Sequence, residues 1–549
     1  RGTYPDPQKR IFINKEVCEG CGDCSRTSNC LSVVPIETEL GRKRAIDQAS
    51  CNKDYTCLDG FCPSFVTVHG GTLARPENPL PPPAPPPIPA ITADPCNILL
   101  TGIGGTGVTT VGALLGMAAH LDGKACTVLD MTGLAQKGGA VLSHIRIARD
   151  RHALSAVRLD EGEADLLLGF DLVVAGAAET LSKLKPGSAY ALVNRHEQIT
   201  GAFTRAPDLG FPGAALMRRI AERIGNAKAE FIDATSMVGR LLGDTILTNI
   251  FLLGRAYQRG LIPLSSDALE QAIRLNGTSV ERNLQAFAWG RVAEEEEKPR
   301  PRSGAEKITY RAELLTRYQN RLYAERYLAL VRRVEAAENA LMPGASALTL
   351  AVAETLFKLM AYKDEYEVAR LMSDGRFRRD LEQQFSGPTR LEFHLAPPAL
   401  GTTKRRFGPW MMPVFAVLAK FRFLRGTPFD PFGYSEDRRT ERRLIQEYES
   451  LIEEILGSLD AGNYPRAITL AGIAGEIRGF GHIKRASIEK AHAAQEAALR
   501  DFSTHPHPFP LPQAGEGAER SEAGEGSRKS AGYSAASSSK EGFMPSARR

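Results

Sequence analysis

The sequence predicts a chain of several domains that combines α+β and α/β structure, because three features divide it. Seven of the nine cysteines lie between residues 18 and 62, a run of prolines follows at 79–89, and an apolar stretch at 97–101 leads into a glycine-rich turn. We expect six parts: a cysteine-rich module at 1–75, a Pro-rich linker at 76–95, a Rossmann-like α/β domain at 96–293, a charged linker at 294–307, a mainly helical domain at 308–502 and a disordered tail at 503–549.

The first cysteines of the module have the spacing of iron–sulfur ligands. Cys18, Cys21 and Cys24 form the repeat C-x-x-C-x-x-C, and Cys62 stands directly before a proline. In ferredoxins such a repeat wraps a short loop around a [4Fe–4S] cluster, and a distant cysteine before a proline supplies the fourth ligand. We therefore predict a two-cluster ferredoxin-like module whose first cluster is bound by these four cysteines.

A second set of ligands repeats this spacing with one change. Cys51 and Cys57 lie six residues apart, and Asp54 stands where the middle cysteine is expected. Together with Cys30 they form the predicted second set. A carboxylate is a harder ligand than a thiolate, so this set would hold either a [4Fe–4S] cluster or a [3Fe–4S] cluster. The alternative for Asp54 is that it caps a turn.

Two other interpretations of the cysteines stay open. Paired C-x-x-C motifs also bind structural zinc, with four ligands around one ion. Disulfides are typical of small secreted domains, whereas this chain shows no signal peptide and has an odd number of cysteines. The triplet spacing favours an iron–sulfur cluster over both.

Length and charge exclude some classes of function. The 549 residues are 43% hydrophobic and carry a formal net charge of +5, which is close to balance for so long a chain. This balance indicates neither a nucleic acid nor a membrane surface as partner. The longest apolar stretch, Pro409–Ala419, is too short to span a bilayer. We expect a cytoplasmic protein.

The glycine-rich turn opens the predicted α/β domain. The apolar stretch Asn97–Thr101, the expected first strand, leads into Gly102-Ile-Gly-Gly-Thr-Gly107, and a helical pattern follows at Val108–His120. The expected second strand is Cys126–Leu129, directly before Asp130. Backbone amides at such a helix N-terminus can face a phosphate, so a dinucleotide site is one interpretation, with Asp130 as its acidic residue. The candidate ligand contacts are Gly102, Gly104, Gly105 and Gly107, and in the loop after the second strand Gln136, Lys137, Gly138 and Gly139.

Apolar runs and periodicity predict the remaining elements. The expected parallel strands are Val141–Ile147 and Asp171–Ala175, with further strands at Gly187–Asn194 and Phe231–Asp233. The expected helices are Pro212–Ile224, Ser236–Arg259, Tyr310–Ala340 and Glu436–Leu459. The prolines at 79–89 predict a semi-rigid spacer. Lys404–Pro413 and Arg425–Gly433 are predicted to be loop-rich, and the composition after Phe502 predicts disorder.

Several of these motifs together resemble one family. The peptides are Val17–Cys24, Ser50–Asp54, Gly60–Val66, Gly102–Val108, Gln136–Gly139 and Ile477–Lys484. Over about residues 1–500 the chain is similar to the long, fused indolepyruvate:ferredoxin oxidoreductases. In that family a 2-oxo acid condenses with thiamine diphosphate and loses carbon dioxide. Its electrons pass through [4Fe–4S] clusters to ferredoxin, and coenzyme A takes the acyl group.

The resemblance also implies what this chain contributes. Residues 96–293 would be the family's gamma-type domain, and its glycine turn and the loop 136–139 would contact the substrate or coenzyme A. The domains that bind thiamine diphosphate and Mg precede the cysteine module in the family, and nothing here matches them, so we expect an incomplete portion of the enzyme. No catalytic residue can be named, because the cofactor does the covalent chemistry.

The resemblance implies partners as well, and two other functions stay open. The implied partners are ferredoxin, an aryl 2-oxo acid and further copies of the chain in a homo-oligomer. The alternatives are an NAD(P)- or flavin-linked ferredoxin reductase and a non-enzymatic electron-transfer subunit.

Overall fold

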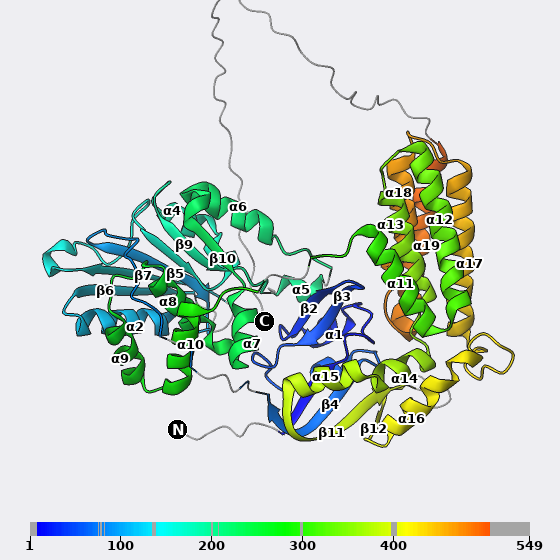
Figure 1. Cartoon of the computed structure of the whole chain (residues 1–549), viewed down its shortest axis with the longest axis horizontal. Helices are drawn as coiled ribbons and strands as arrows, with labels where there is room; N and C mark the ends of the chain where they lie inside the picture. Colours follow the sequence, from blue (N-terminus) through cyan, green and yellow to red (C-terminus); the bar gives the residue numbers. More distant parts are fainter. Residues whose placement is uncertain are drawn as a thin grey trace, which may run out of the picture. The chain divides into compact units, whose positions relative to one another are not determined.

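The computed structural model describes residues 8–504, apart from 75, 77–79, 82, 134–138, 199–200, 207, 297–299 and 397–402. Within these residues the chain forms three β-sheets and many helices, which Figure 1 shows. The mixed α and β class that the sequence predicts is confirmed. Of the predicted disordered tail, only residues 503 and 504 lie within the described range, where they end helix α19. None of the helices described has the length and hydropathy needed to cross a membrane.

One antiparallel sheet joins the cysteine module to a segment more than 300 residues away. Strand β1 (Lys9–Ile13) pairs with β4 (Phe65–Leu73), β4 pairs with β11 (Phe385–Leu395), and β11 pairs with β12 (Arg405–Phe407). The sequence predicted helices and loops for the region of β11 and β12. Gly387 and Pro388, which normally argue against a strand, lie here at an irregularity in the pairing between Ser386 and Thr389.

The two faces of this sheet pack against different cores. Ile11 and Phe65 face a small core that contains the cysteines. Val66 and Val68 face Phe377 and Phe393, in a core shared with helices α14 (Glu365–Ser373), α15 (Gly375–Gln384) and α16 (Met411–Leu418). Because side chains alternate along a strand, β4 contributes to both cores at once. The module is completed by helix α1 (Asp23–Ser28), the paired strands β2 (Val33–Thr38) and β3 (Gly41–Ile46), and the short helix η1 (Thr56–Asp59).

The α/β domain is built on a six-stranded sheet in the order β10-β9-β8-β5-β7-β6. Its strands are β5 (Cys96–Ile103), β6 (Ala125–Thr132), β7 (Ala140–Ala148), β8 (Leu166–Gly169), β9 (Tyr190–Asn194) and β10 (Ala229–Ile232). The strands predicted at 97–101, 187–194 and 231–233 are confirmed as β5, β9 and β10.

Two other predictions for this sheet are wrong. The stretch Val141–Ile147 is a strand, β7, but it runs antiparallel to both of its neighbours. The stretch Asp171–Ala175 is not a strand, because Asp171 caps the short helix α3 (Leu172–Ala175) by accepting the N–H of Val174. Short apolar runs predict burial but do not distinguish a strand from a buried helix, nor parallel from antiparallel pairing.

Helices cover both faces of the sheet. Ile98 and Leu100 of β5 share a core with helices α2 (Val108–Leu121), α8 (Thr248–Gln258), α9 (Ser266–Asn276) and α10 (Val280–Val292). Leu99 packs on the other face with α3 and α6 (Gly213–Ile224). The shorter helices are α4 (Ala178–Lys183), α5 (Ala202–Arg205) and α7 (Ala234–Leu242). The helix predicted at 236–259 is interrupted, because α7 ends at Gly243, whose φ of 69° is left-handed.

The described part of the proline run lies along this domain instead of standing apart from it. The main-chain oxygens of Ala84 and Pro85 accept hydrogen bonds from Arg291 and Gln258. The N–H of Ala90 donates to the oxygen of Gly260, over 2.8 Å. Gly260 has a φ of 70°, and an added Cβ would collide with the oxygen of Ile88. Residues 84–90 are therefore fastened to the ends of α8 and α10.

Six helices of the C-terminal half stand side by side in Figure 1 and share one core. They are α11 (Gly304–Tyr318), α12 (Arg321–Leu341), α13 (Ala347–Met360), α17 (Glu436–Gly457), α18 (Tyr464–Gly472) and α19 (Gly481–Thr504). The long helix predicted at 310–340 is divided into α11 and α12, because Asn320 caps a new helix by accepting the N–H of Tyr323. The helix predicted at 436–459 is confirmed as α17.

We predict that His394 makes the sheet sensitive to acid. His394 is buried on β11, with its Nε2 2.7 Å from Oγ1 of Thr67 on β4. Burial, reinforced by the charge of Lys404, lowers the pKa of His394 from 6.5 to about 4. The unfolded chain then binds a proton that the folded chain does not, so stability falls as the pH drops from 6.5 to 4. The loss approaches about 3 kcal/mol, at 1.36 kcal/mol per pH unit.

Urea denaturation between pH 4 and pH 7 measures this effect. His394→Gln should remove most of the dependence, whereas the exposed control His152→Gln should keep it. An unchanged slope in His394→Gln would show that other groups cause the acid sensitivity.

Candidate iron–sulfur centre and glycine turn

Six of the seven cysteines of the module lie in or against one small core, and all seven are free thiols. Cys18, Cys24 and Cys57 are buried in this core, Cys30, Cys51 and Cys62 are half-buried against it, and Cys21 is half-buried nearby in the chain. Thiols that lie close together raise one another's pKa. Burial raises the pKa of Cys62, and the neighbouring thiols of Cys18 and Cys21 raise it further. The structure therefore brings Cys62 to the triplet, as the predicted first ligand set requires.

The remaining cysteines form a second group. Burial raises the pKa of Cys57 to about 12, with further contributions from Cys51, Cys30 and Asp54. Cys57 also raises the pKa of Cys24, so the two groups are neighbours. Cys30, Cys51 and Cys57 therefore lie near one another, and the division of the seven cysteines into two sets of cluster ligands stays a prediction.

Asp54 has a local role in the structure. Its exposed carboxylate accepts hydrogen bonds from the N–H of Thr56, over 3.1 Å, and from Oγ1 of Thr56 and Nδ2 of Asn52. The bond from the N–H of Thr56 contributes most to lowering the pKa of Asp54. Thr56 begins η1, so this carboxylate caps a turn. Iron ligation by Asp54 stays a prediction beside that role.

The thiols of the module are the donor type that iron–sulfur clusters use. Nowhere in the described residues do three His, Cys, Asp or Glu side chains come close enough to hold one metal ion. A zinc site needs four ligands around one ion, whereas the ligands of a cubane each bind a different iron and stand farther apart. Seven free thiols in two neighbouring groups are the set that Cys18, Cys21, Cys24 and Cys62, and then Cys30, Cys51 and Cys57, would offer to two clusters.

Glycines and backbone amides shape the loops around these sulfurs. The N–H of Gly20 donates to Sγ of Cys18, and the N–H of Ser64 donates to Sγ of Cys62, each over 3.3 Å. Gly20 has a φ of 69°, and an added Cβ would collide with the oxygen of Arg42. Hydrogen bonds to cluster sulfurs are one means by which proteins set a reduction potential.

Lys404 reaches this centre from a distant part of the chain. Its Nζ donates to the oxygens of Leu58, over 2.6 Å, and Gly60, in the loop between Cys57 and Cys62. The ammonium also lies 4.9 Å from the ring centre of Phe65. Burial lowers the pKa of Lys404, while the nearby thiols oppose this shift. Sequence analysis missed Lys404, because no local pattern connects residue 404 with residues 58–60.

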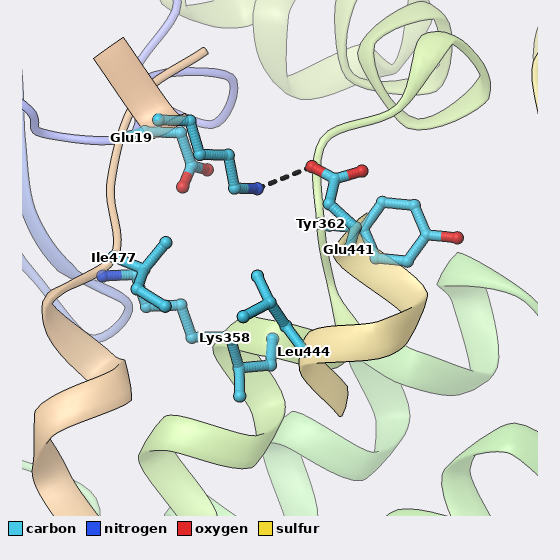
Figure 2. Close-up of a pocket in the computed structure, with 8 residues that line it drawn as sticks. Glu19, Lys358, Tyr362, Glu441, Leu444 and Ile477 are labelled. Carbon is cyan, nitrogen blue, oxygen red and sulfur yellow. Dashed lines mark hydrogen bonds and ion pairs between the residues drawn. The ribbon is translucent and has the colours of Figure 1, made fainter. Parts of the chain in front are cut away.

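Glu19, in the triplet loop, faces a small cavity against the helices (Figure 2). The cavity is about 10 Å³ in volume, which is room for about one water molecule and far too little for an aryl 2-oxo acid. It is lined by Glu19, Lys358, Leu359, Tyr362, Glu441, Leu444, Ile477 and Lys484. Nζ of Lys484 donates to Glu441 over 2.6 Å, and burial lowers the pKa of Lys358 to about 8. Charged side chains of the helices and of the triplet loop therefore meet at this cavity.

The glycine turn joins β5 to α2 and leaves space above Gly105. Gly105 and Gly107 have φ values of 89° and 93°, which favour glycine, and an added Cβ at Gly105 would meet no atom of the described residues within 4 Å. The N–H of Gly104 donates to the oxygen of Gly139 over 2.8 Å, so the turn contacts the end of the 136–139 loop. The other candidates in that loop, Gln136, Lys137 and Gly138, lie outside the described residues.

The sheet order argues against the dinucleotide interpretation of this turn. Asp130 lies on β6, and β7 stands between β6 and β5. In dinucleotide-binding folds the strand that carries the acidic residue lies directly beside the first strand. Here the carboxylate of Asp130 instead lies near Gly112 in α2, and Asn249 of α8 supports the turn by donating to the oxygen of Thr106.

We predict that Lys404→Met destabilises the folded chain by about 2–3 kcal/mol. The change leaves the oxygens of Leu58 and Gly60 without their donor, and a buried polar group left unpaired costs about 1–3 kcal/mol. Urea denaturation measures the effect, and Lys404→Arg should restore part of the loss. The exposed control Lys420→Met should change stability by no more than about 0.5 kcal/mol. Equal stabilities of the Lys404→Met and control variants would contradict this role.

Two family models match separate parts of the chain. Residues 97–293 match the pyruvate ferredoxin/flavodoxin oxidoreductase family, and residues 305–497 match a family of unknown function, DUF6537. The first match spans the six-stranded sheet and its helices. The chain is thus part of an enzyme of the 2-oxoacid:ferredoxin oxidoreductase class.

Relatives narrow the assignment. Indolepyruvate oxidoreductase subunit IorB of Pyrococcus horikoshii is 30% identical over 202 residues, which are 36% of this chain and 96% of that protein. The subunit IorB of Thermococcus kodakarensis is 28% identical over 202 residues, with the same coverage. The chain belongs to the family of indolepyruvate oxidoreductase subunit IorB.

Solved structures are similar to a comparable share of the chain. Pyruvate oxidoreductase subunit PORC from Thermotoga maritima is 20% identical and covers 36% of this chain and 96% of its own, with a TM-score of 0.27. The gamma subunit of a keto/oxoacid ferredoxin oxidoreductase from Geobacter sulfurreducens is 23% identical with the same coverage and a TM-score of 0.25.

Proposed function

We propose that this chain is the electron-transfer and gamma-type portion of a thiamine-dependent indolepyruvate:ferredoxin oxidoreductase. The complete enzyme would oxidatively decarboxylate an aryl 2-oxo acid, and coenzyme A would take the acyl group. The family assignment supports the reaction class. The observation that carries the electron-transfer role is the pair of neighbouring cysteine groups in one core.

In this proposal the cysteines hold two clusters. Cys18, Cys21, Cys24 and Cys62 bind the first [4Fe–4S] cluster. Cys30, Cys51 and Cys57, with Asp54 as the candidate fourth ligand, bind the second, as a [4Fe–4S] or [3Fe–4S] form. Because Cys24 and Cys57 are neighbours, the two sets of ligands would hold their clusters near each other, and an electron would have a short path between them.

The other residues around the clusters orient and screen them. Amide donors at Gly20 and Ser64 stabilise the sulfur charge of their ligands, and the ammonium of Lys404 offsets the thiolate charge on the loop 57–62. The apolar core around Ile11 and Phe65 would help to keep water from clusters bound at these cysteines.

The glycine turn is the proposed contact for substrate or coenzyme A. The candidate residues are Gly102, Gly104, Gly105, Gly107, Gln136, Lys137, Gly138 and Gly139. The open space above Gly105 supports this role, because backbone there can approach a ligand closely. Thiamine diphosphate, with Mg, would supply the carbanion chemistry from domains outside this chain.

The alternatives are less well supported. An NAD(P)- or flavin-linked reductase would need a nucleotide site, and the position of β7 disfavours one at the glycine turn. The other alternative is a non-enzymatic electron-transfer subunit. This portion of the enzyme would behave in that way when it is separated from the thiamine domains. Assembly of several copies into a homo-oligomer stays a prediction.

Cluster analysis of the anaerobically purified chain tests the proposal. Iron and sulfide contents should indicate two clusters, and electron paramagnetic resonance should separate their signals. Cys18→Ser should remove one signal and Cys57→Ser the other, because they belong to different groups. The control Cys96→Ser, at a buried cysteine on β5, should leave both signals.

Two outcomes would contradict the proposal. One is a wild-type chain without iron, and the other is loss of the same signal in both cysteine variants. With indolepyruvate, thiamine diphosphate, coenzyme A and a dye acceptor, the chain alone should show no turnover, and a thiamine-binding portion should restore it.

A further inference from the structure

An exposed aromatic surface lies on the helical part of the chain, over α16, the short helix η6 (Ala419–Leu424) and the turns that follow. Seven of the seventeen large apolar side chains exposed in the described residues fall between residues 410 and 434. Phe429 is 81% exposed and Phe423 65% exposed. Single exposed apolar residues are ordinary, but a concentration of aromatic ones indicates an interaction site. The aromatic members are Trp410, Phe421, Phe423, Phe429 and Tyr434.

The same segment is basic. Between residues 403 and 435 there are six lysines and arginines, and Asp430 is the one acidic residue. Asp430 is buried and accepts hydrogen bonds from Oη of Tyr366 and the N–H of Gly426. Arg425 is buried as well and pairs with Asp364. No described acidic side chain pairs with the other exposed or half-exposed cations of the segment: Arg405, Arg406, Lys420 and Arg422.

The aromatic–basic surface, defined by the exposed side chains of residues 405–434, rests on a packed framework. Phe415 of α16 contacts Phe393 of β11 edge to face, with ring centres 5.1 Å apart. Phe432 contacts Tyr366 in the same way, at 5.3 Å. The exposed rings are therefore held on ordered elements, which lowers the entropy that binding would cost.

Strand β12 connects this surface to a residue that contacts the cysteine centre. Strand β12 begins directly after Lys404, whose Nζ contacts the loop between Cys57 and Cys62. At the other end of β12, Phe407 contacts Trp410, with ring centres 6.0 Å apart. A protein that contacts Arg405 and Arg406 would therefore lie near Lys404, while α16 covers the face of the sheet opposite the cysteines.

We propose that the aromatic–basic surface docks an acidic electron-carrier protein, the ferredoxin of the proposed function, on which this inference rests. Interface cores are rich in aromatic residues and arginine and poor in acidic residues, as this segment is. Arg405, Arg406 and Lys420 attract a negatively charged carrier, and the rings of Phe423 and Phe429 bury apolar area against it. One electron then passes from a reduced cluster to the oxidised ferredoxin, and no atoms are transferred.

The test uses the complete cluster-loaded chain and an oxidised ferredoxin of net negative charge. The rate at which ferredoxin oxidises the reduced clusters is compared with the rate for a small dye acceptor. The double change Arg405→Glu and Arg406→Glu should lower the ratio of the two rates about tenfold at low salt and weaken ferredoxin binding by a similar factor. Phe423→Ser with Phe429→Ser should also weaken binding, and this effect should persist at high salt.

Matched controls lie elsewhere on the chain. Arg218→Glu with Arg219→Glu changes two exposed adjacent arginines on α6, and Leu322→Ser removes an apolar side chain that is 75% exposed on α12. Both controls should bind ferredoxin as the wild type does.

The outcomes separate this inference from the proposed function. A wild-type chain without clusters, or one that reduces neither acceptor, would overturn both. Clusters that ferredoxin oxidises at the same rate in the wild type and in both surface variants would overturn the docking site alone. The docking site would also be overturned if the surface variants left the ferredoxin kinetics unchanged but altered self-association of the chain. The same holds if they altered only its binding to vesicles of phosphatidylcholine and phosphatidylglycerol.

Discussion

The antiparallel pairing of β4 with β11 is the constraint on which the cysteine module depends. It opposes Val66 to Phe393 and Val68 to Leu391, across more than 300 residues of sequence. Without it, β1 and β4 would form a two-stranded ribbon with one face uncovered, and such ribbons are marginally stable in water. The pairing adds two strands and places Phe377, Phe393 and the helices around them against the open face.

This arrangement gives the helical region a structural role beside the cysteines. Residues 305–497 match a family of unknown function, and in this chain they supply β11, β12 and the lysines that approach the cysteine loops. Lys404 holds the loop 57–62, while Lys358 and Lys484 lie at the cavity that Glu19 faces. The cysteine loops are therefore contacted by a part of the chain that the sequence separates from them by the whole α/β domain.

Local patterns were readable from the sequence, and long-range contacts were not. The sequence predicted the glycine turn and helix α17, because each depends on residues that are neighbours in the chain. The cysteine repeat is visible for the same reason. Strand β11 was not predicted, because Gly387 and Pro388 interrupt its pattern and its register depends on β4. The position of Lys404 was not predicted, because its partners are distant in sequence. The direction of β7 was not predicted, because a short apolar run does not distinguish parallel from antiparallel pairing. Asp54 shows a different limit, because ligands and turn caps use the same side chain.

We infer that the cysteine module and the helical region unfold as one unit through their shared sheet. Native-state hydrogen exchange of the amides of β4 and β11, followed at increasing urea, tests it directly. We predict one opening free energy for both strands, equal to within about 0.5 kcal/mol, and a common dependence on urea. Exchange of β11 at an opening free energy several kcal/mol below that of β4 would contradict the claim, because it would show that the module keeps its structure after the helical region has left it.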